Sequence, residues 1–217
     1  MNIYAYHPSD PTRSLLHIDD WVVKYGVGTD GCCRICHKPM GVKGDKSQRQ
    51  THFAHQQHSG CPTVAENHIP YAGLRALPRD PSIESAAKTY ALENIEGIYF
   101  KMKKFVTALS WKEMLELLET ARRENIWSLK DMPHEYIPYV LLTCTTSFKA
   151  NKQYGRNQEM FFVLEPSPDA GDYWNFPKGY KRYIWEITLP GRVVTHHELE
   201  LTTPTVWYMG RVNELLA

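Results

Sequence analysis

The amino-acid sequence predicts an α+β protein in which a small N-terminal domain, residues 1–77, precedes a larger domain, residues 78–217, of helices packed on antiparallel strands. Three observations support this fold class. A polar stretch near the N-terminus is rich in Cys and His, a central segment shows helical periodicity, and the final third is rich in strand-forming residues. Pro78 and Pro81 lie close together and would break any helix, so we place the domain boundary there.

The first two thirds of the chain are expected to contain short strands and then helices. Residues 1–31 are predicted to form an extended lead-in, with one strand over residues 20–25. A helix is predicted over residues 82–94 with Ser82 as its N-cap, and residues 98–106 are expected to form a strand or an irregular segment. The clearest helix spans residues 110–125, because Ser110 and Glu113 form a capping box. Its apolar side chains recur at helical spacing and are assigned to the core: Trp111, Met114, Leu115, Leu118 and Ala121.

The final third is predicted to be mainly β. Strands are expected over residues 136–146, where Pro138 indicates an edge or a strand start, and over residues 159–164. Residues 181–189 and 192–199 are predicted to form a hairpin around Pro190-Gly191, a pair suited to a type II turn. Residues 205–209 are expected to form a last strand.

Composition limits the classes of protein that fit. The chain has 217 residues and a net charge of only +1, so any contact with nucleic acid must come from local patches. The five cysteines are odd in number and four lie in one region, which indicates a reducing compartment rather than a disulfide framework. The start of the chain has no signal-peptide pattern, and no apolar run approaches the roughly 20 residues that span a bilayer. We therefore expect a soluble, cytoplasmic protein.

Residues 33–61 contain the candidate metal ligands. Cys33 and Cys36 have C-x2-C spacing, and Cys61 follows after a polar stretch that could not fold alone, so a bound metal would give it a reason to be ordered. Zinc prefers four nitrogen or sulfur ligands in a tetrahedron. The spacing leaves the fourth ligand open among three histidines: His52, His55 and His58. The motifs of catalytic zinc sites, H-E-x-x-H and H-x-E…C-x-x-C, do not occur, so we predict a structural Zn²⁺.

This stretch resembles the zinc-ribbon-like module at the start of CoiA-like competence proteins, which carry C-x2-C and then HF-x-H before a Cys. The resemblance favours His55 as the fourth ligand beside Cys33, Cys36 and Cys61. A CoiA-like relative would be a metal-dependent nuclease with a D…E-x-K pattern. Here no Asp or Glu is followed two positions later by Lys, and Glu186, on a predicted strand, is followed by Ile and Thr. We therefore keep the nuclease as an alternative hypothesis.

Three patches of cations are candidate nucleic-acid contacts, although each one alone could be an ordinary solvated loop. The first lies in the metal region and consists of Lys43, Lys46 and Arg49. The second follows a predicted strand and consists of Lys149, Lys152 and Arg156. The third places Lys178, Lys181 and Arg182 among four aromatic residues, Tyr173, Trp174, Phe176 and Tyr180. Aromatic rings beside cations suit base stacking and backbone contact.

The layout of the whole chain is similar to that of the zinc-finger-bearing large subunit of type IV CRISPR effector complexes. The shared features are the C-x2-C pair with later ligands near Cys61, a helix that begins Trp111-Lys112, the segment PHEYIPYVLL with a lysine-rich exit, and the strand MFFVL. The resemblance implies a non-enzymatic subunit that contacts the 5′ handle of a guide RNA, the target-flanking DNA motif and other subunits of the complex. A further alternative is a phage-type inhibitor that acts by protein–protein binding.

Overall fold

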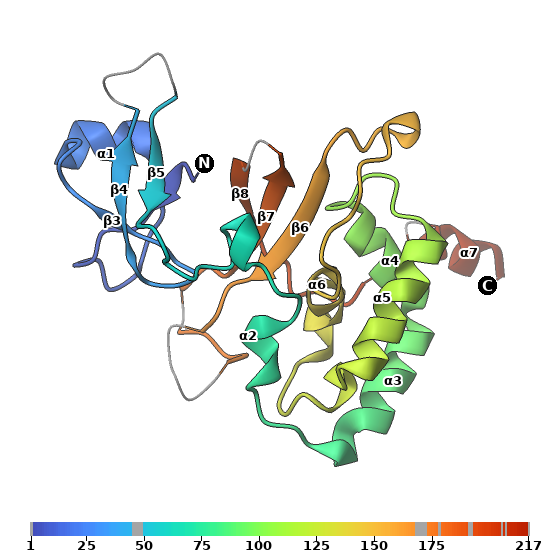
Figure 1. The fold of residues 1–217 in the computed structure, drawn as a ribbon. Helices are drawn as coiled ribbons and strands as arrows, with labels where there is room; N and C mark the ends of the chain where they lie inside the picture. Colours follow the sequence, from blue (N-terminus) through green and yellow to red (C-terminus); the bar gives the residue numbers. More distant parts are fainter. Residues whose placement is uncertain are drawn as a thin grey trace.

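The computed structural model describes residues 2–44, 50–167, 173–177, 179–190, 193–204, 206 and 208–216. Within these residues, helices pack on antiparallel sheets, so the predicted α+β class is confirmed. A three-stranded sheet, the central sheet, stands between an N-terminal module, which comprises the described residues up to residue 70, and a group of helices (Figure 1). The predicted metal ligands all lie in the N-terminal module.

The N-terminal module contains two small antiparallel sheets, one of β1 and β2 and one in the order β3-β4-β5. Its helices and strands are β1 (Tyr4–Ala5), β2 (Leu16–His17), α1 (Ile18–Tyr25), β3 (Gly31–Cys32), β4 (Pro39–Lys43), β5 (His52–His55) and the 3₁₀ turn η1 (Ala65–Asn67). Asn2 forms bridges to both Phe53 of β5 and Val194 of the central sheet. The start of the chain therefore links the module directly to the rest of the protein.

The predicted strand over residues 20–25 is wrong, because this segment belongs to helix α1. The side chain of His17 caps the helix by accepting a hydrogen bond from the Asp19 amide, and the acidic residues in the first turn suit the positive end of the helix dipole. Ile18 and Trp21, three positions apart, are the residues that the helix buries. The helix ends at Gly26, whose φ of 77° is easy only for glycine.

The helical group contains α2 (Ala72–Arg75), η2 (Pro81–Ile83), α3 (Glu84–Glu93), α4 (Ile95–Lys103), α5 (Trp111–Arg123), η3 (Ile126–Ser128), η4 (His134–Tyr136), α6 (Ile137–Leu142) and η5 (Lys152–Tyr154). The predicted helix over residues 82–94 is confirmed as η2 and α3, although Asp80 rather than Ser82 provides the cap. The capping box of Ser110 and Glu113 starts α5 as predicted. The buried face of α5 is Met114, Leu117 and Ala121, whereas Trp111 and Leu115, which were assigned to the core, are exposed.

Two further predictions are wrong because the segments are helical: residues 98–106 lie largely in α4, and residues 136–146 contain α6. Every residue of α6 is buried, so its sequence lacks the polar face that would reveal a helical period. Pro138 lies in the first turn of α6, where the missing N–H costs no hydrogen bond. The same proline was consistent with a strand start when judged from the sequence alone.

The central sheet contains β6 (Glu159–Leu164), β7 (Tyr183–Leu189) and β8 (Val193–Glu198) in this order, all antiparallel. The predicted strand over residues 159–164 and the predicted hairpin are confirmed. The type II turn falls partly on Gly191 and Arg192, which lie outside the described residues. The predicted strand over residues 205–209 is not formed by its described residues, since Tyr208 is in a turn and Met209 begins helix α7 (Met209–Leu216).

The central sheet is buried on both faces and completes two separate hydrophobic cores. Successive side chains of a strand point to opposite faces. On one face Phe161, Trp185 and Ile187 pack with the core of the N-terminal module. On the other face Phe162, Leu164 and Ile184 pack with the core of the helices. The domain boundary near Pro78 remains a prediction, but the N-terminal core depends on strands that follow it by about a hundred residues in the sequence.

The partly buried ring of His196 gives a testable pH dependence. The ring lies against Tyr4, Tyr183 and Trp185, at centroid distances of 4.4, 4.7 and 5.3 Å. Burial, with smaller effects of His197 and Arg34, lowers the pKa of His196 from 6.5 to about 4. The unfolded chain therefore binds more protons than the folded chain between these two values, so the free energy of unfolding should fall as the pH falls from about 6.5 to about 4.

Urea unfolding near neutral pH and near pH 4.5 measures this fall. The variant His196→Phe keeps an aromatic ring but cannot titrate, so it should show a smaller fall than the unmodified protein. An equal fall in both proteins would assign the pH dependence to other groups.

Candidate metal centre

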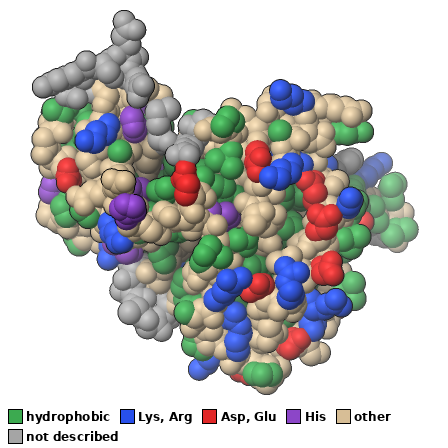
Figure 2. All heavy atoms as spheres, viewed as in Figure 1, with side chains coloured by type: hydrophobic (Ala, Val, Ile, Leu, Met, Phe, Trp, Pro, Cys, Tyr) green, Lys and Arg blue, Asp and Glu red, His purple; other side chains and the backbone are tan. Residues whose placement is uncertain are grey.

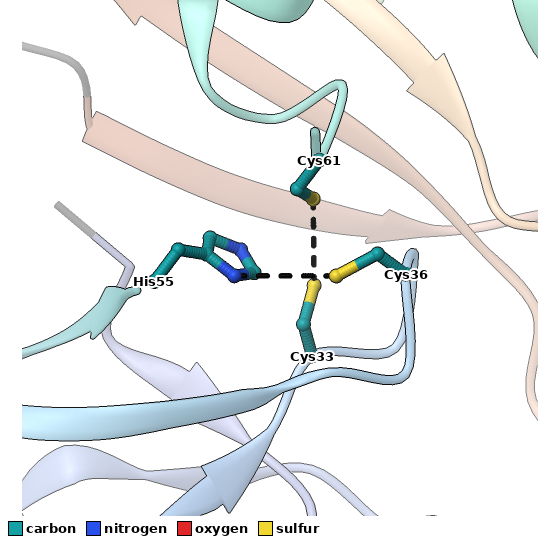
Figure 3. A group of neighbouring side chains, drawn as sticks. All are labelled: Cys33, Cys36, His55 and Cys61. Atoms are coloured by element: carbon teal, nitrogen blue, oxygen red, sulfur yellow. Dashed lines mark hydrogen bonds between the residues drawn. The ribbon is translucent and has the colours of Figure 1, made fainter. Parts of the chain in front are cut away.

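Four side chains, Cys33, Cys36, His55 and Cys61, form a cluster that could hold a metal ion, with one donor atom from each lying within 4.8 Å of the others. The Cys33 and Cys61 sulfurs are 3.9 Å apart, and the Cys36 sulfur is 4.0 Å from Nδ1 of His55 (Figure 3). An ion bound tetrahedrally at about 2.3 Å would hold two sulfurs about 3.8 Å apart. The cluster thus has nearly the dimensions of a tetrahedral site. Of the three candidate histidines, only His55 belongs to it.

Local backbone geometry brings the ligands together. Cys33 follows β3, and its amide donates to the Lys38 carbonyl at 3.0 Å, while the His37 amide donates to the Cys33 carbonyl at 2.8 Å. These bonds close the tight turn that carries Cys33 and Cys36, and His37 takes a left-handed φ of 57° within it. His55 ends β5 and is paired in register with Met40 of β4. Cys61 follows Gly60, whose φ of 70° lets the chain turn toward the other ligands.

The four groups influence one another strongly. Hydrogen bonds from the Cys33 and Cys61 thiols hold the pKa of Cys36 far below its usual range, and the same bonding to Cys36, with burial, raises the pKa of Cys33. Burial lowers the pKa of His55, but hydrogen bonding to Cys36 and Cys61 outweighs it and raises this pKa to about 9. Because a metal requires thiolates and a neutral imidazole, ion binding here must release protons.

Arg34 lies between the first two ligands, and its side chain extends from the module to the end of the central sheet. Its guanidinium forms an ion pair with Glu165 at 2.5 Å, and the two side chains are 2% and 0% exposed. It also donates to the carbonyls of Arg13 and Lys181, at 2.9 and 2.7 Å. Burial raises the pKa of Glu165, and Arg34 is the strongest of the groups that oppose this rise. Sequence analysis missed both residues, although a cation inside a C-x2-C turn is a signal that could have been used.

The nine cations of the three predicted patches have different surroundings, and Lys181 is exposed but pairs with Glu198 at 2.8 Å. Lys46, Arg49 and Lys178 lie outside the described residues. Lys43, at the end of β4, and Lys152, in η5, are exposed, while Lys149 is exposed but pairs with Glu159 at 2.5 Å.

Arg156 and Arg182 are buried and are therefore reassigned to intramolecular contacts. Arg156 pairs with Glu113 at 2.5 Å and donates to the Lys149 carbonyl at 2.7 Å. Arg182 donates twice to the Glu165 carbonyl, at 3.0 and 2.7 Å. Its guanidinium lies over four rings, those of Tyr136, Tyr173, Trp174 and Phe176. Three of the aromatic residues that were candidates for base stacking thus surround a cation of the same chain.

No protein-family model matches the chain, and neither a curated protein nor a solved structure matches it significantly. The resemblances to CoiA-like proteins and to the type IV CRISPR subunit therefore stay predictions. Within the part of the chain that the structure describes, no helix combines the length and the apolar character needed to cross a bilayer.

The surroundings of Arg182 predict that charge alone cannot replace it. Arg182→Lys keeps the positive charge but loses the planar group that contacts the rings and donates two bonds to Glu165. We expect the free energy of unfolding to fall by roughly 2–4 kcal/mol in urea titrations, since the contacts with the rings are weakened and the buried Glu165 carbonyl loses at least one of its two donors. The neighbouring Lys181→Ala breaks only an exposed pair with Glu198 and should leave the free energy of unfolding nearly unchanged. Equal effects would contradict the assignment.

Proposed function

We propose that the protein is a non-enzymatic nucleic-acid-binding protein whose N-terminal module is held together by a structural zinc ion. The observation that carries the proposal is the cluster of three cysteines and one histidine. Soft thiolates with an imidazole in a tetrahedral arrangement suit zinc, whereas magnesium and calcium prefer oxygen ligands. Four protein ligands fill a tetrahedron, and a site of this kind keeps no open position for a reacting water.

The zinc ion would add folding energy to a module whose own small core is completed by the central sheet. Cys33 and Cys61 are fully buried, but the stretch between them includes polar loops and short strands. Binding of zinc to ligands on the tight turn of Cys33 and Cys36, on β5 and on the following loop would fix these three segments relative to one another. Structural zinc sites of this type contribute their binding free energy directly to folding.

Lys43 and Lys152 support the nucleic-acid part of the proposal. Both are exposed, and neither makes an ion pair with another residue that the structure describes. Lys43 ends β4, whose neighbour β5 carries the candidate ligand His55. Two more cations, Lys46 and Arg49, follow it closely in the sequence. Figure 2 shows Lys and Arg interspersed with Asp and Glu over the face drawn, so contacts with phosphates would depend on such local positions. Membership of an RNA-guided complex remains a narrower prediction, which co-purification with partner subunits and guide RNA would test.

The metal prediction is tested by elemental analysis of the purified protein. About one zinc per chain is expected, and Cys33→Ser, Cys36→Ser, Cys61→Ser and His55→Ala should each lose the metal and unfold the module. The matched controls are Cys32→Ser, His52→Ala and His58→Ala, because these residues lie beside the ligands but outside the cluster. Metal content well below one equivalent, or equal loss in the controls, would contradict the assignment.

The nucleic-acid prediction is tested by binding to single-stranded RNA and to DNA at two salt concentrations. Lys43→Ala and Lys152→Ala should each weaken binding about equally for all sequences and lower the salt slope by about one, because a phosphate contact releases a counterion. Lys112→Ala, an exposed lysine on α5, serves as the control. Binding that neither lysine variant changes would contradict the assignment of Lys43 and Lys152 to phosphate contacts. Absence of binding would favour the protein–protein inhibitor hypothesis, and magnesium-dependent cleavage would favour the nuclease.

A further inference from the structure

The buried side chain of Arg34 connects the cluster of three cysteines and His55 to the end of the central sheet. Arg34 lies between Cys33 and Cys36, so an ion that fixes both sulfurs also fixes the backbone from which the Arg34 side chain projects. Nε of Arg34 donates to Glu165 at 2.6 Å across a sequence separation of 131 residues. The guanidinium also lies over the rings of Tyr180 and Tyr183, at 4.4 and 5.0 Å. The geometry of the turn therefore determines whether this cation reaches its partner.

Glu165 lies at the end of one strand and is hydrogen-bonded to the start of the next. It directly follows β6, and its amide donates to the Tyr183 carbonyl at 3.1 Å. Its carboxylate accepts hydrogen bonds from the Tyr183 amide and the Tyr180 hydroxyl, both at 3.0 Å. Its carbonyl accepts both bonds from Arg182. One residue thus joins the end of β6, the start of β7 and the ring cluster around Arg182.

We propose that the pair of Arg34 and Glu165 couples metal occupancy of the cluster to the stability of this end of the central sheet. The inference rests on the proposed structural metal. If the turn loosens when the metal leaves, Arg34 can withdraw and leave a carboxylate with no cation in a fully buried position. Removal of one partner of a buried pair leaves an uncompensated buried charge, so the strand ends must open or Glu165 must take up a proton.

The coupling acts in both directions. A free energy that the metal contributes to the strand ends must also appear in the affinity for the metal, because linkage between two sites is reciprocal. Residues that orient metal ligands from the next layer typically change metal affinity by roughly 10–100-fold when substituted. Loss of the metal, by a chelator or by oxidation of the thiolates, would therefore be transmitted to the sheet that both cores share.

The first experiment measures metal affinity by chelator competition with zinc and with cobalt in the full-length protein. Glu165→Gln should weaken binding by roughly 10–100-fold while the cobalt spectrum keeps its thiolate charge-transfer bands, which shows that the ligands are unchanged. The matched control is Glu198→Gln, the same substitution at an exposed pair with Lys181 at the same end of the sheet, and it should leave the affinity unchanged. Equal affinities of Glu165→Gln and the unmodified protein would overturn the coupling without affecting the proposed metal site.

The second experiment needs no variant and keeps the proposal testable if Glu165→Gln fails to fold. Hydrogen exchange of the unmodified protein is compared with metal bound and after chelation. The amides of Glu165 and Tyr183 should exchange faster after chelation, whereas amides within α5 should change much less. Unchanged protection of Glu165 and Tyr183 in a protein that has lost its metal would overturn the proposal. A protein that never binds metal would overturn both this inference and the proposed structural zinc, while nucleic-acid binding is measured separately.

Discussion

One three-stranded sheet has to complete two hydrophobic cores, and the rest of the structure depends on this constraint. Trp185 and Phe161 face the N-terminal module, and their sequence neighbours Ile184 and Phe162 face the helices. Neither core would be closed without the sheet. The module has short strands and a single helix of its own, so it needs both this apolar wall and a cross-link among its loops. The cluster of three cysteines and His55 can provide that cross-link.

Several cations of the protein are buried and make intramolecular contacts. Three arginines are buried: Arg34, Arg156 and Arg182. The first two donate to the carboxylates of Glu165 and Glu113, and the third donates to the Glu165 carbonyl. A guanidinium suits this role because it stays charged, makes several bonds in one plane and stacks on rings. The rings of Tyr173, Trp174 and Phe176 are occupied by Arg182. A count of cations and aromatic residues along the sequence therefore overestimates what the surface can offer to a nucleic acid.

Those parts of the fold with strong local signals could be predicted from the sequence. The capping box at Ser110 identified α5, strand-forming residues identified β6, and Pro190-Gly191 between two such runs identified the hairpin. The segments that became α1, α4 and α6 gave the wrong prediction for a common reason. Their residues are rich in aromatic and β-branched side chains, which favour strands weakly, and tertiary packing overrides such preferences. In α6 complete burial also removes the polar face that would have shown the helical period.

In the candidate metal site, the residues that lie close together in the sequence could be predicted, whereas a distant partner could not. Its four ligands lie within one short stretch, so spacing and a family resemblance were enough to name the residues that the structure brings together. Arg34 also lies in that stretch, but its partner is 131 residues away and has no motif of its own. A cation between two ligands of a buried turn requires a buried acceptor, because an unpaired charge there would be too costly. The place of Arg34 between two candidate ligands can be seen in the sequence, but its burial and its partner Glu165 follow only from the packing of the turn against the ends of β6 and β7.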